Sequence, residues 1–412
     1  MSLETAVEIL LQSVQPVGTE KVSIKSALGR VLSEDLSAPI NLPPFNRSPL
    51  DGYAVRAEDI ATAAPDRPVL LEISQEIPAG SYSAIELGRN QAAKIMTGSP
   101  LPSGADVVIK FEDVKITNNK VEVAFSLPPY ANYCFAGEDI QQGERLLCKG
   151  NVIDPASIGI LAALGISAVP VYRLPKVAII GTGEELVEIT EQLKPGKIFD
   201  SNSYVLAAYI RQAGVETVIT EIVNDSKEKI ARKISENLES IDMVITTGGV
   251  SVGDFDFVRE ALISIGAKLL FHKIAMRPGS PALSAVKDGK LIICLSGNQA
   301  AAFTTFHLLA VPALAGLMGI TKRQMTATTA VLVDDYPKTV TRRNFLRGQA
   351  FFDDGHVKVR ITGKQNPGII KSTLSSNALI DVPADTENLK AGARVKILFL
   401  HSLFRNSQNE LF

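Results

Sequence analysis

The sequence predicts a multidomain fold in which a doubly wound α/β domain is joined to two regions of β-structure. The chain has 412 residues. One hydrophobic core usually serves about 100–200 residues, so we expect roughly two to four domains. Strand-like and helix-like segments alternate over residues 174–322, as in a parallel sheet with helices on both faces. Short strand-like segments without helical periodicity fill residues 69–125 and 327–400.

Residues 1–43 and 138–173 are predicted to form one small domain that an insertion divides. Apolar residues recur at helical spacing from Ser2 to Val14. A second apolar helix is expected from Ala156 to Leu164, just before Gly165. The chain therefore returns to its first domain after the insertion.

The insertion, residues 44–137, is predicted to be rich in β-strands. The expected strands are Val69–Ile73, Ala93–Met96, Val107–Phe111 and Lys120–Phe125. Asn118 and Asn119 separate the last two strands as a turn. The earlier stretch Leu42–Val55 contains three prolines and an Asp-Gly pair, which predict a rigid irregular loop. Long irregular loops inside compact proteins are often functional.

The α/β domain is expected over residues 174–322. Its predicted strands are Val177–Ile180, Glu216–Val223, Met243–Ile245, Lys268–Ile274 and Leu291–Leu295. Its predicted helices are Ser201–Ala213, Asp225–Leu238, Phe255–Ser264 and a helix from Asn298 onward. Ligands bind outside the carboxyl ends of the strands in such sheets. Here those ends are Gly181–Glu185, Asn224–Asp225, Thr246–Gly249, Arg277–Pro281 and Ser296–Asn298.

Residues 323–412 are predicted to form a small β-barrel or sandwich. No long helical periodicity runs through this region. Short strands are expected around Val331, Phe345, Val357–Ile361, Ala378–Ile380 and Val395–Leu398.

The stretch Asp242–Glu260 predicts a binding site for phosphate-like groups. A short apolar strand ends at Thr246-Thr247-Gly248-Gly249, and a helix follows. Glycines let the backbone approach a ligand closely, and a helix start offers unpaired N–H groups. Asp254 and Asp256 lie at this start, where a phosphate would repel them unless a metal ion lay between. The alternative is that both acids only cap the helix and complement its dipole.

The composition excludes several classes of protein. A net charge of −2 and 6% aromatic residues argue against a nucleic-acid-binding surface. The three cysteines, Cys134, Cys148 and Cys294, form no C-x-x-C pair, which is typical of a reducing compartment. The N-terminus carries acids where a signal peptide needs basic and then apolar residues, so a cytoplasmic protein is predicted.

The most apolar stretch, Leu291–Ile320, is predicted to be buried and not to span a membrane. Polar residues interrupt it from Gly297 to Gln299 and again at His307, and Pro312 would kink a helix there. A buried strand followed by a buried helix accounts for its composition.

Acids and basic residues are the remaining candidates for chemistry. The four histidines have no ligand spacing, no G-x-S-x-G elbow is present, and Gly181–Glu185 lacks the third glycine of a dinucleotide fingerprint. The acids that could supply oxygen ligands to Mg²⁺ are Asp51, Glu185, Asp225 and Asp256. The cations that could hold an anion are Lys273, Arg277 and Arg347. Taken singly, each such charge is more often a solvated surface residue.

Seven motifs, in order along the chain, match one known family. They are P-x-F-N-R-S-P-L-D-G-Y-A at Pro43–Ala54, M-T-G-S-P-L-P at Met96–Pro102, G-E-D-I at Gly137–Ile140, G-T-G-E-E-L at Gly181–Leu186, D-S-N at Asp200–Asn202, T-G-G-V-S-V-G-D-F-D at Thr247–Asp256 and R-P-G-S-P at Arg277–Pro281. On these motifs the chain resembles the molybdopterin molybdenumtransferase family, which includes bacterial MoeA and the E domain of gephyrin.

The resemblance implies a fold and a reaction. The family fold has four domains. The linker domain fits residues 1–43 with 138–173, and the β-hammerhead insert fits 44–137. The doubly wound pterin-binding domain fits 174–322, and the C-terminal β-barrel fits 323–412. By resemblance, the enzyme binds adenylated molybdopterin, hydrolyses its phosphoanhydride with a divalent metal such as Mg²⁺, and inserts molybdate, which gives molybdenum cofactor and AMP. The resemblance also implies a homodimer and names the molybdopterin adenylyltransferase as a candidate partner, with no nucleic-acid or membrane partner.

The resemblance also carries over site residues by position. The implied catalytic and metal-binding acids are Asp51, Glu185, Asp225 and Asp256. The implied substrate-binding residues are Thr97, Gly248, Gly249, Ser251, Lys273, Arg277, Pro278, Gly297, Asn298 and Arg347. Arginine suits a tetrahedral oxyanion because its donors form a fixed fork, so Arg277 should replace the family's usual lysine.

Three departures from the family pattern leave two hypotheses. Tyr133–Ala136 carries no charge where arginines are common, Leu295–Gln299 lacks the two usual prolines, and Ser280 replaces a common lysine. The retained acids favour an active molybdenum-inserting transferase. The alternative is a non-catalytic molybdopterin-binding paralogue that acts as a carrier or scaffold, and AMP release would distinguish the two. Molybdate and tungstate both fit, because they have nearly the same size and charge.

Overall fold

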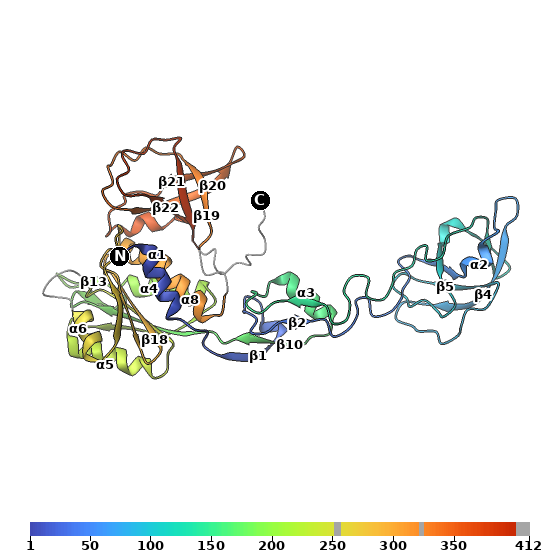
Figure 1. The fold of residues 1–412 in the computed structure, drawn as a ribbon, viewed down its shortest axis with the longest axis horizontal. Helices are drawn as coiled ribbons and strands as arrows, with labels where there is room; N and C mark the ends of the chain where they lie inside the picture. Colours follow the sequence, from blue (N-terminus) through green and yellow to red (C-terminus); the bar gives the residue numbers. More distant parts are fainter. Residues whose placement is uncertain (251–256, 321–324, 401–412) are drawn as a thin grey trace. The chain divides into compact units, whose positions relative to one another are not determined.

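The computed structural model describes residues 1–250, 257–320 and 325–400, and Figure 1 shows its ribbon. The chain divides into two compact units, which are described one at a time. Unit 1 comprises Met1–Glu34, Cys148–Ile158 and Ser167–Phe412, and unit 2 comprises Asp35–Leu147 and Gly159–Ile166.

Unit 1 is built on a six-stranded mixed sheet. In spatial order its strands are β14 (Glu216–Val223), β11 (Lys176–Thr182), β15 (Met243–Thr247), β18 (Lys290–Leu295), β17 (Leu283–Lys287) and β16 (Lys268–His272). The first four run parallel, and β17 pairs antiparallel with both of its neighbours. All the predicted strands of this domain are confirmed, but the prediction missed β17. The sequence feature that indicates β17 is Asp288-Gly289, which forms a two-residue turn between β17 and β18 with both φ angles positive.

Helices cover both faces of this sheet, because its strand residues alternate between two cores. Val177 and Ile179 belong to the core that contains α1 (Leu3–Gln12), α4 (Asn202–Gln212), α7 (Gln299–Thr305), the π-helical turn Phe306–Ala310 and α8 (Val311–Leu317). Ala178 and Ile180 belong to the core that contains α5 (Lys227–Leu238) and α6 (Phe257–Ser264). Figure 1 shows α5 and α6 apart from α1, α4 and α8. The predicted doubly wound arrangement is therefore confirmed.

The long helical stretch Gln299–Leu317 lies inside unit 1. It has 19 residues and is apolar enough to cross a membrane, but its most apolar window is entirely buried within the protein. Strand β18 precedes it directly. The predicted pair of a buried strand and a buried helix is confirmed, and burial accounts for the apolar composition.

The C-terminal part of unit 1 is a closed barrel. Around it run β19 (Ala327–Leu332), β21 (His356–Ile361), β20 (Asn344–Asp353), β22 (Ala378–Val382) and β23 (Arg394–Phe399). Leu346, Val359 and Ile380 pack in its interior. All five strands lie where short strands are predicted, and closure leaves no exposed sheet edge. The choice between a barrel and a sandwich is thus settled as a barrel.

Short elements complete unit 1. They are the pair β1 (Thr19–Ser23) and β10 (Ala168–Tyr172), the pair β12 (Leu186–Val187) and β13 (Ile198–Phe199), and the 3₁₀ turns η1 (Ile24–Ser26) and η4 (Ile370–Thr373). Helix α3 (Pro155–Ala163), expected from Ala156, is divided between the two units.

Unit 2 contains a second six-stranded sheet. Its order is β6 (Val107–Lys110), β3 (Gly52–Val55), β5 (Gln91–Ile95), β4 (Val69–Ile77), β8 (Lys120–Val123) and β7 (Lys115–Thr117). The other elements are α2 (Ala57–Ile60), the 3₁₀ turn η2 (Phe111–Asp113) and the pair β2 (Leu36–Ser37) and β9 (Arg145–Leu147). The four predicted strands of the insertion are confirmed. Asn118 and Asn119, with φ angles of 50° and 62°, form the turn between β7 and β8.

The prediction of an irregular loop through Val55 is wrong for its last four residues. Gly52–Val55 forms β3, between β6 and β5. A Cβ on Gly52 would lie 1.9 Å from the carbonyl oxygen of Ile109, so glycine is needed for β3 to approach β6. This Asp-Gly pair marks a close strand contact, whereas the sequence rule interprets it as a turn.

Candidate functional site

The strand order of unit 1 brings two loops together at the carboxyl ends of β11 and β15. The chain passes from β11 outward to β14 and then returns to the other side of β11 as β15. Doubly wound proteins bind ligands at such a reversal, because the flanking connections leave on opposite faces of the sheet. The flanking loops here are Gly183–Glu185 and Gly248–Gly249. We call this end of β11, β14 and β15 the acidic edge.

Glycine is required at the turn after β15. Gly248 and Gly249 have φ angles of +103° and +62°, which disfavour other residues. A Cβ on Gly248 would also lie 2.1 Å from the carbonyl oxygen of Thr182, at the end of β11. The close backbone approach expected here is therefore made to the neighbouring strand, and the approach to a ligand stays a prediction.

Two of the four predicted acids, Glu185 and Asp225, come together at the acidic edge. Glu185 follows β11 and is exposed, whereas Asp225 follows β14 and is half-buried. Burial and, second, the negative charge of Glu185 raise the pKa of Asp225. Oδ1 of Asp225 is buried and has no hydrogen-bond partner among the described residues. Helix α5 begins two residues later and is capped by Ser226, so the carboxylate of Asp225 is not used as a cap.

This pair fits a bound cation. Mg²⁺ takes one or two carboxylates, and a positive charge would offset the repulsion between Glu185 and Asp225. The unpartnered buried oxygen of Asp225 is an available ligand atom. Of the other two predicted acids, Asp256 lies outside the described residues, as does Ser251, and Asp51 belongs to unit 2. No group of three or more His, Cys, Asp or Glu residues suited to a metal occurs in the described part of the chain.

Asn202 joins the loops after β15 and β18. Its Nδ2 donates to Oγ1 of Thr247 at 2.8 Å and to the carbonyl oxygen of Gly297 at 2.9 Å. Oγ1 of Thr247 donates in turn to the carbonyl oxygen of Ser296 at 3.1 Å. This network fixes Gly297, a predicted substrate residue, beside the glycine turn. Asn202 is absent from the predicted site, although it lies in the D-S-N motif at Asp200–Asn202.

A cavity of about 500 Å³ opens beside the loop after β18. The α/β part lines it with Met276–Pro281, Ser296, Asn298 and Ala301, and the barrel lines it with Thr339–Arg342, Asn344 and Pro367. We call it the cationic cavity, because its lining contains Arg277 and Arg342 and no carboxylate among the described residues. Three predicted substrate residues, Arg277, Pro278 and Asn298, are thereby brought together. The barrel residues were not predicted, because they are far from Arg277 in sequence.

Two hydrogen bonds between Ile274 and Ser280 close the turn that contains Arg277. Ile274 donates its N–H to the carbonyl oxygen of Ser280 at 2.8 Å, and Oγ of Ser280 donates back to Ile274 at 2.9 Å. Ser280, which replaces a common lysine of the family, therefore closes the turn. Lys273, at a φ of 69°, is exposed and is not among the residues that line the cavity.

Arg347 belongs to strand β20 of the barrel, and none of its surface is exposed. Its Nε donates to Oγ of Ser372 at 3.0 Å, and its Nη2 donates to the carbonyl oxygens of Lys364 and Asn366 at 3.3 and 3.4 Å. Burial lowers the pKa of Arg347 to about 10, which leaves it charged at neutral pH. Its Nη1 is buried without a hydrogen-bond partner among the described residues, and Arg347 does not line the cationic cavity.

In unit 2, Asp51 is paired with Thr97. Oδ1 of Asp51 accepts hydrogen bonds from the backbone N–H and from Oγ1 of Thr97, both at 2.7 Å. The backbone bond, followed by the hydroxyl bond, lowers the pKa of Asp51. Both residues are exposed. Asp51 directly precedes β3, and Thr97 follows β5. Two predicted site residues that are far apart in sequence are thus in contact.

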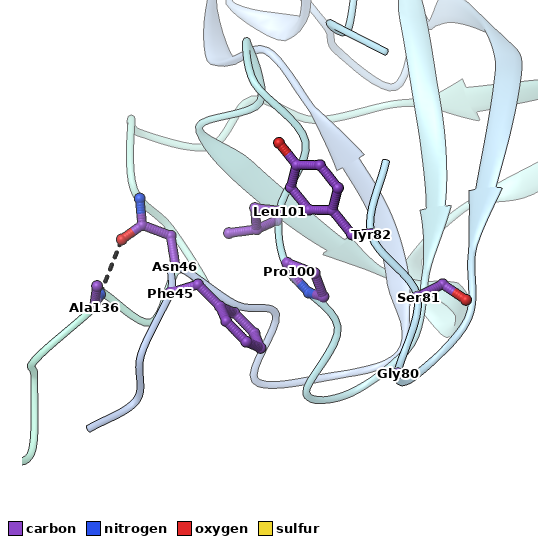
Figure 2. Close-up of a pocket in the computed structure, with 8 residues that line it drawn as sticks. All are labelled: Phe45, Asn46, Gly80, Ser81, Tyr82, Pro100, Leu101 and Ala136. Carbon is purple, nitrogen blue, oxygen red and sulfur yellow. Dashed lines mark hydrogen bonds between the residues drawn. The ribbon is translucent and has the colours of Figure 1, made fainter. Parts of the chain in front are cut away.

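A pocket of about 610 Å³ in unit 2 has a mainly apolar lining, which includes neither Asp51 nor Thr97. Figure 2 shows Phe45, Tyr82, Pro100 and Leu101 around it, with Oδ1 of Asn46 accepting a hydrogen bond from the backbone N–H of Ala136. Its lining contains no acid and no cation among the described residues. Its size therefore does not make it the chemical centre.

Comparisons with known proteins agree along the whole chain. Three family models match, described as "MoeA N-terminal region (domain I and II)" over residues 1–165, "Probable molybdopterin binding domain" over 178–316 and "MoeA C-terminal region (domain IV)" over 329–400. The molybdopterin molybdenumtransferase of Staphylococcus epidermidis is 36% identical over 402 residues, which are 98% of this chain and 96% of that protein. The molybdopterin molybdenumtransferase of Bacillus subtilis is 37% identical over 387 residues, which are 93% and 90% of the two chains.

Solved structures agree with these sequence matches. Two structures of the molybdopterin biosynthesis protein MoeA from Pyrococcus horikoshii match with TM-scores of 0.87 and 0.81, each at 33% identity. They cover 98% and 97% of this chain and 99% of their own chains. The resemblance that the seven sequence motifs indicate is confirmed: the chain belongs to the molybdopterin molybdenumtransferase family, and it is a transferase of molybdenum cofactor biosynthesis.

Proposed function

We propose that the protein inserts molybdate into adenylated molybdopterin and releases AMP. The observation that carries this proposal is that two oppositely charged regions, the acidic edge and the cationic cavity, both adjoin one loop, Ser296–Asn298. The substrate would place a phosphoanhydride and an oxyanion near each other. The phosphoanhydride needs a cation beside it, and the oxyanion needs hydrogen-bond donors beside it.

Mg²⁺ is the proposed cation, and Glu185 and Asp225 are its proposed ligands together with Asp51 and Asp256. When bound, this ion would neutralise charge on the phosphoanhydride as it breaks. The residues of the chain do the remaining work. The proposed contacts to the phosphates come from Gly248, Gly249 and Ser251. The hydrogen bonds of Asn202 are proposed to hold the loop at Gly297 beside the glycine turn. Thr97 is proposed to orient the carboxylate of Asp51, to which it is hydrogen-bonded.

Molybdate is the proposed occupant of the cationic cavity. Arg277 would bind it through charge-assisted hydrogen bonds, supported by Pro278 and Asn298 in the same lining. Lys273 is proposed to attract the anion from its exposed position. Arg347 is proposed as a further cation, because its charged guanidinium has an unpartnered Nη1 within the described structure.

The wider assignments also rest on the resemblance. We propose a cytoplasmic homodimer with the four-domain partition predicted from the sequence, and the molybdopterin adenylyltransferase as a partner that hands over the substrate. The resemblance implies that each site draws Asp51 from one subunit and Asp256, which lies outside the described residues, from the other. Inactive Asp51→Ala and Asp256→Ala chains should then complement each other in mixed dimers and recover roughly a quarter of the wild-type activity. No recovery in verified mixed dimers would contradict the shared site.

The deciding experiment measures AMP. Purified protein is mixed with adenylated molybdopterin, molybdate and Mg²⁺, and AMP release is followed with and without a chelator. We expect release that needs both molybdate and the divalent ion. Tight binding of the adenylated pterin without any AMP would favour the carrier or scaffold function, and release that is unchanged in excess chelator would contradict the metal assignment.

A further inference from the structure

Two neighbouring arginines, Arg342 and Arg343, stand where the barrel meets the cationic cavity, and their surroundings differ. Nε and Nη2 of Arg343 bind the two oxygens of Asp381 at 2.7 and 2.8 Å. Its Nη1 also donates to Oε1 of Glu4. Asp381 is only 6% exposed, so this arginine is held by two carboxylates and its charge is balanced.

Arg342 has no such partner. It is exposed, it makes no ion pair with any described residue, and it lines the cationic cavity together with Arg277. The other polar groups in that lining are hydroxyls and amides, including Ser280, Ser296 and Asn298. A cavity with two arginines and no carboxylate among the described lining residues is electrostatically suited to an anion.

The backbone fixes the place of Arg342 relative to Arg277. The N–H of Arg277 donates to the carbonyl oxygen of Arg343 at 2.8 Å, and the N–H of Phe345 donates to the carbonyl oxygen of Arg277 at 2.8 Å. Arg343 is itself anchored by its carboxylates and lies over the ring of Phe345, 5.0 Å from its centroid. The residue next to Arg342 is therefore bonded directly to the backbone of Arg277, which keeps both arginines at one cavity.

We propose that Arg342 is a second residue that binds the tetrahedral oxyanion, together with Arg277 in the same cavity. This inference rests on the proposed function, since it gives the cavity the same occupant. Exposed arginines are commonly solvated and bind nothing. Arg342 differs because it shares with Arg277 a cavity whose described lining residues include no carboxylate. Two guanidinium forks can contact more oxygens of one tetrahedral anion than a single fork can.

The test compares Arg342→Gln with Arg394→Gln. Arg394 is another exposed arginine, on β23, without an ion pair to a described residue, so its replacement makes the same change in net charge away from the cavity. Two quantities are measured: the KM for molybdate in AMP release, and the rise in melting temperature that sodium molybdate causes in the protein without pterin, which reports anion binding directly. Sodium sulfate at equal ionic strength is the control salt.

We expect Arg342→Gln to raise the KM for molybdate about tenfold, or ~1.4 kcal/mol, with kcat changed much less. The rise in melting temperature that molybdate causes should shrink, as expected for about tenfold weaker binding of the anion. Arg342→Lys should recover part of the loss, because it keeps the charge but not the fork. Arg394→Gln should behave like the wild type.

The outcomes separate this inference from the function on which it rests. If Arg277→Ala weakens the use of molybdate and Arg342→Gln does not, Arg342 is a solvated surface residue and the inference is wrong while the function stands. If neither variant changes the KM or the stabilisation by molybdate, the cavity is not the oxyanion site, so this inference and the proposed place of molybdate both fail while the reaction itself stands. An Arg342→Gln effect equal to that of Arg394→Gln would show a general charge effect and would also overturn the inference.

Discussion

The acidic edge and the cationic cavity differ in how they are built. The acidic edge is formed by the loops after β11, β14 and β15, which belong to one sheet. The cationic cavity is formed by the turn at Arg277 together with barrel residues 339–344 and 367. The first depends on the strand order of a single domain, whereas the second exists only where two parts of unit 1 meet.

The charges of the two regions differ as well. At the acidic edge, like charges lie close together, and the pKa of Asp225 is raised first by its own burial and second by the charge of Glu185. At the cavity, Arg277 and Arg342 have no ion pair within the described residues, although Arg343 beside them has two. One region therefore favours a cation and the other an anion. The predictions that follow test whether this division is real.

Replacing Gly248 by alanine should have the largest effect. The new Cβ would lie 2.1 Å from the carbonyl oxygen of Thr182 at a φ of +103°, so the turn must move. We expect a loss of about 3 kcal/mol or more in stability together with loss of activity. Gly297→Ala is the matched control, because its Cβ would lie 3.4 Å from Gly248, a tight contact that a small shift relieves. Thermal unfolding compares the two, and equal melting temperatures would contradict the close packing of β11 and β15.

Asp225→Asn should lower kcat/KM for AMP release about 100-fold, because a bound cation that stabilises developing charge supplies several kcal/mol. The concentration of Mg²⁺ needed for half-maximal rate should rise, whereas the KM for molybdate should change little. Glu191→Gln, an exposed acid in the segment between β12 and β13, is the control. A variant at Asp225 with normal dependence on Mg²⁺ would place the metal elsewhere.

Arg277→Ala should raise the KM for molybdate about tenfold or more, since a charge-assisted hydrogen bond contributes ~1.5–3 kcal/mol. High molybdate should restore part of the rate, and binding of the adenylated pterin should be nearly unchanged. Activity titrations with molybdate and with tungstate measure both anions. A rate that is low and indifferent to the oxyanion concentration would count against the cavity.

The smallest expected effect is on stability without metal. Burial and the charge of Glu185 raise the pKa of Asp225, so the folded protein binds this proton more tightly than the unfolded chain does. The stability from that proton is present at low pH and is lost as the pH rises from the ordinary carboxyl range through the raised pKa. At neutral pH, Asp225→Asn should therefore raise the melting temperature slightly, on the order of 1 °C because the group is partly exposed.

That difference should shrink as the pH falls towards the ordinary carboxyl range, where Asp225 is neutral in both states. Added Mg²⁺ should reverse its sign, because the ion stabilises the native carboxylates and not the amide. Melting curves at several pH values, with and without Mg²⁺, test both points. A wild-type protein more stable than Asp225→Asn at neutral pH without metal would mean that the hydrogen bond from the backbone of Glu184 to this carboxylate outweighs its burial and the charge of Glu185.

The sequence predicted well those features that depend on residues near one another in the chain. The alternation of apolar runs with glycine turns placed β11, β15 and β18, and the ends of these strands contain Glu185, Gly248, Gly249 and Asn298. Parallel strands end at the same edge of a sheet, so order along the chain already implies proximity in space. Seven contiguous motifs were sufficient to indicate the family.

Local rules failed where a neighbouring strand decides the outcome. The sequence contains Asp51-Gly52 and Asp288-Gly289, which look alike. The second is the turn between β17 and β18, whereas the first begins β3, because Gly52 meets the backbone of Ile109 on β6. No window around Asp51 contains that information, since the deciding atom lies more than fifty residues away along the chain.

The sequence by itself thus determined the fold class, the family and the acids and glycines at the strand ends, because these depend on periodicity and on contiguous motifs. Only the tertiary structure decided that Glu185 and Asp225 meet, that Arg347 is fully buried, and that Arg342 shares a cavity with Arg277 while Arg343 does not. The physical reason is that burial and charge pairing depend on which distant segments pack together. A sequence reports the type of each charge, and packing determines which charges are neutralised and which remain available to a ligand.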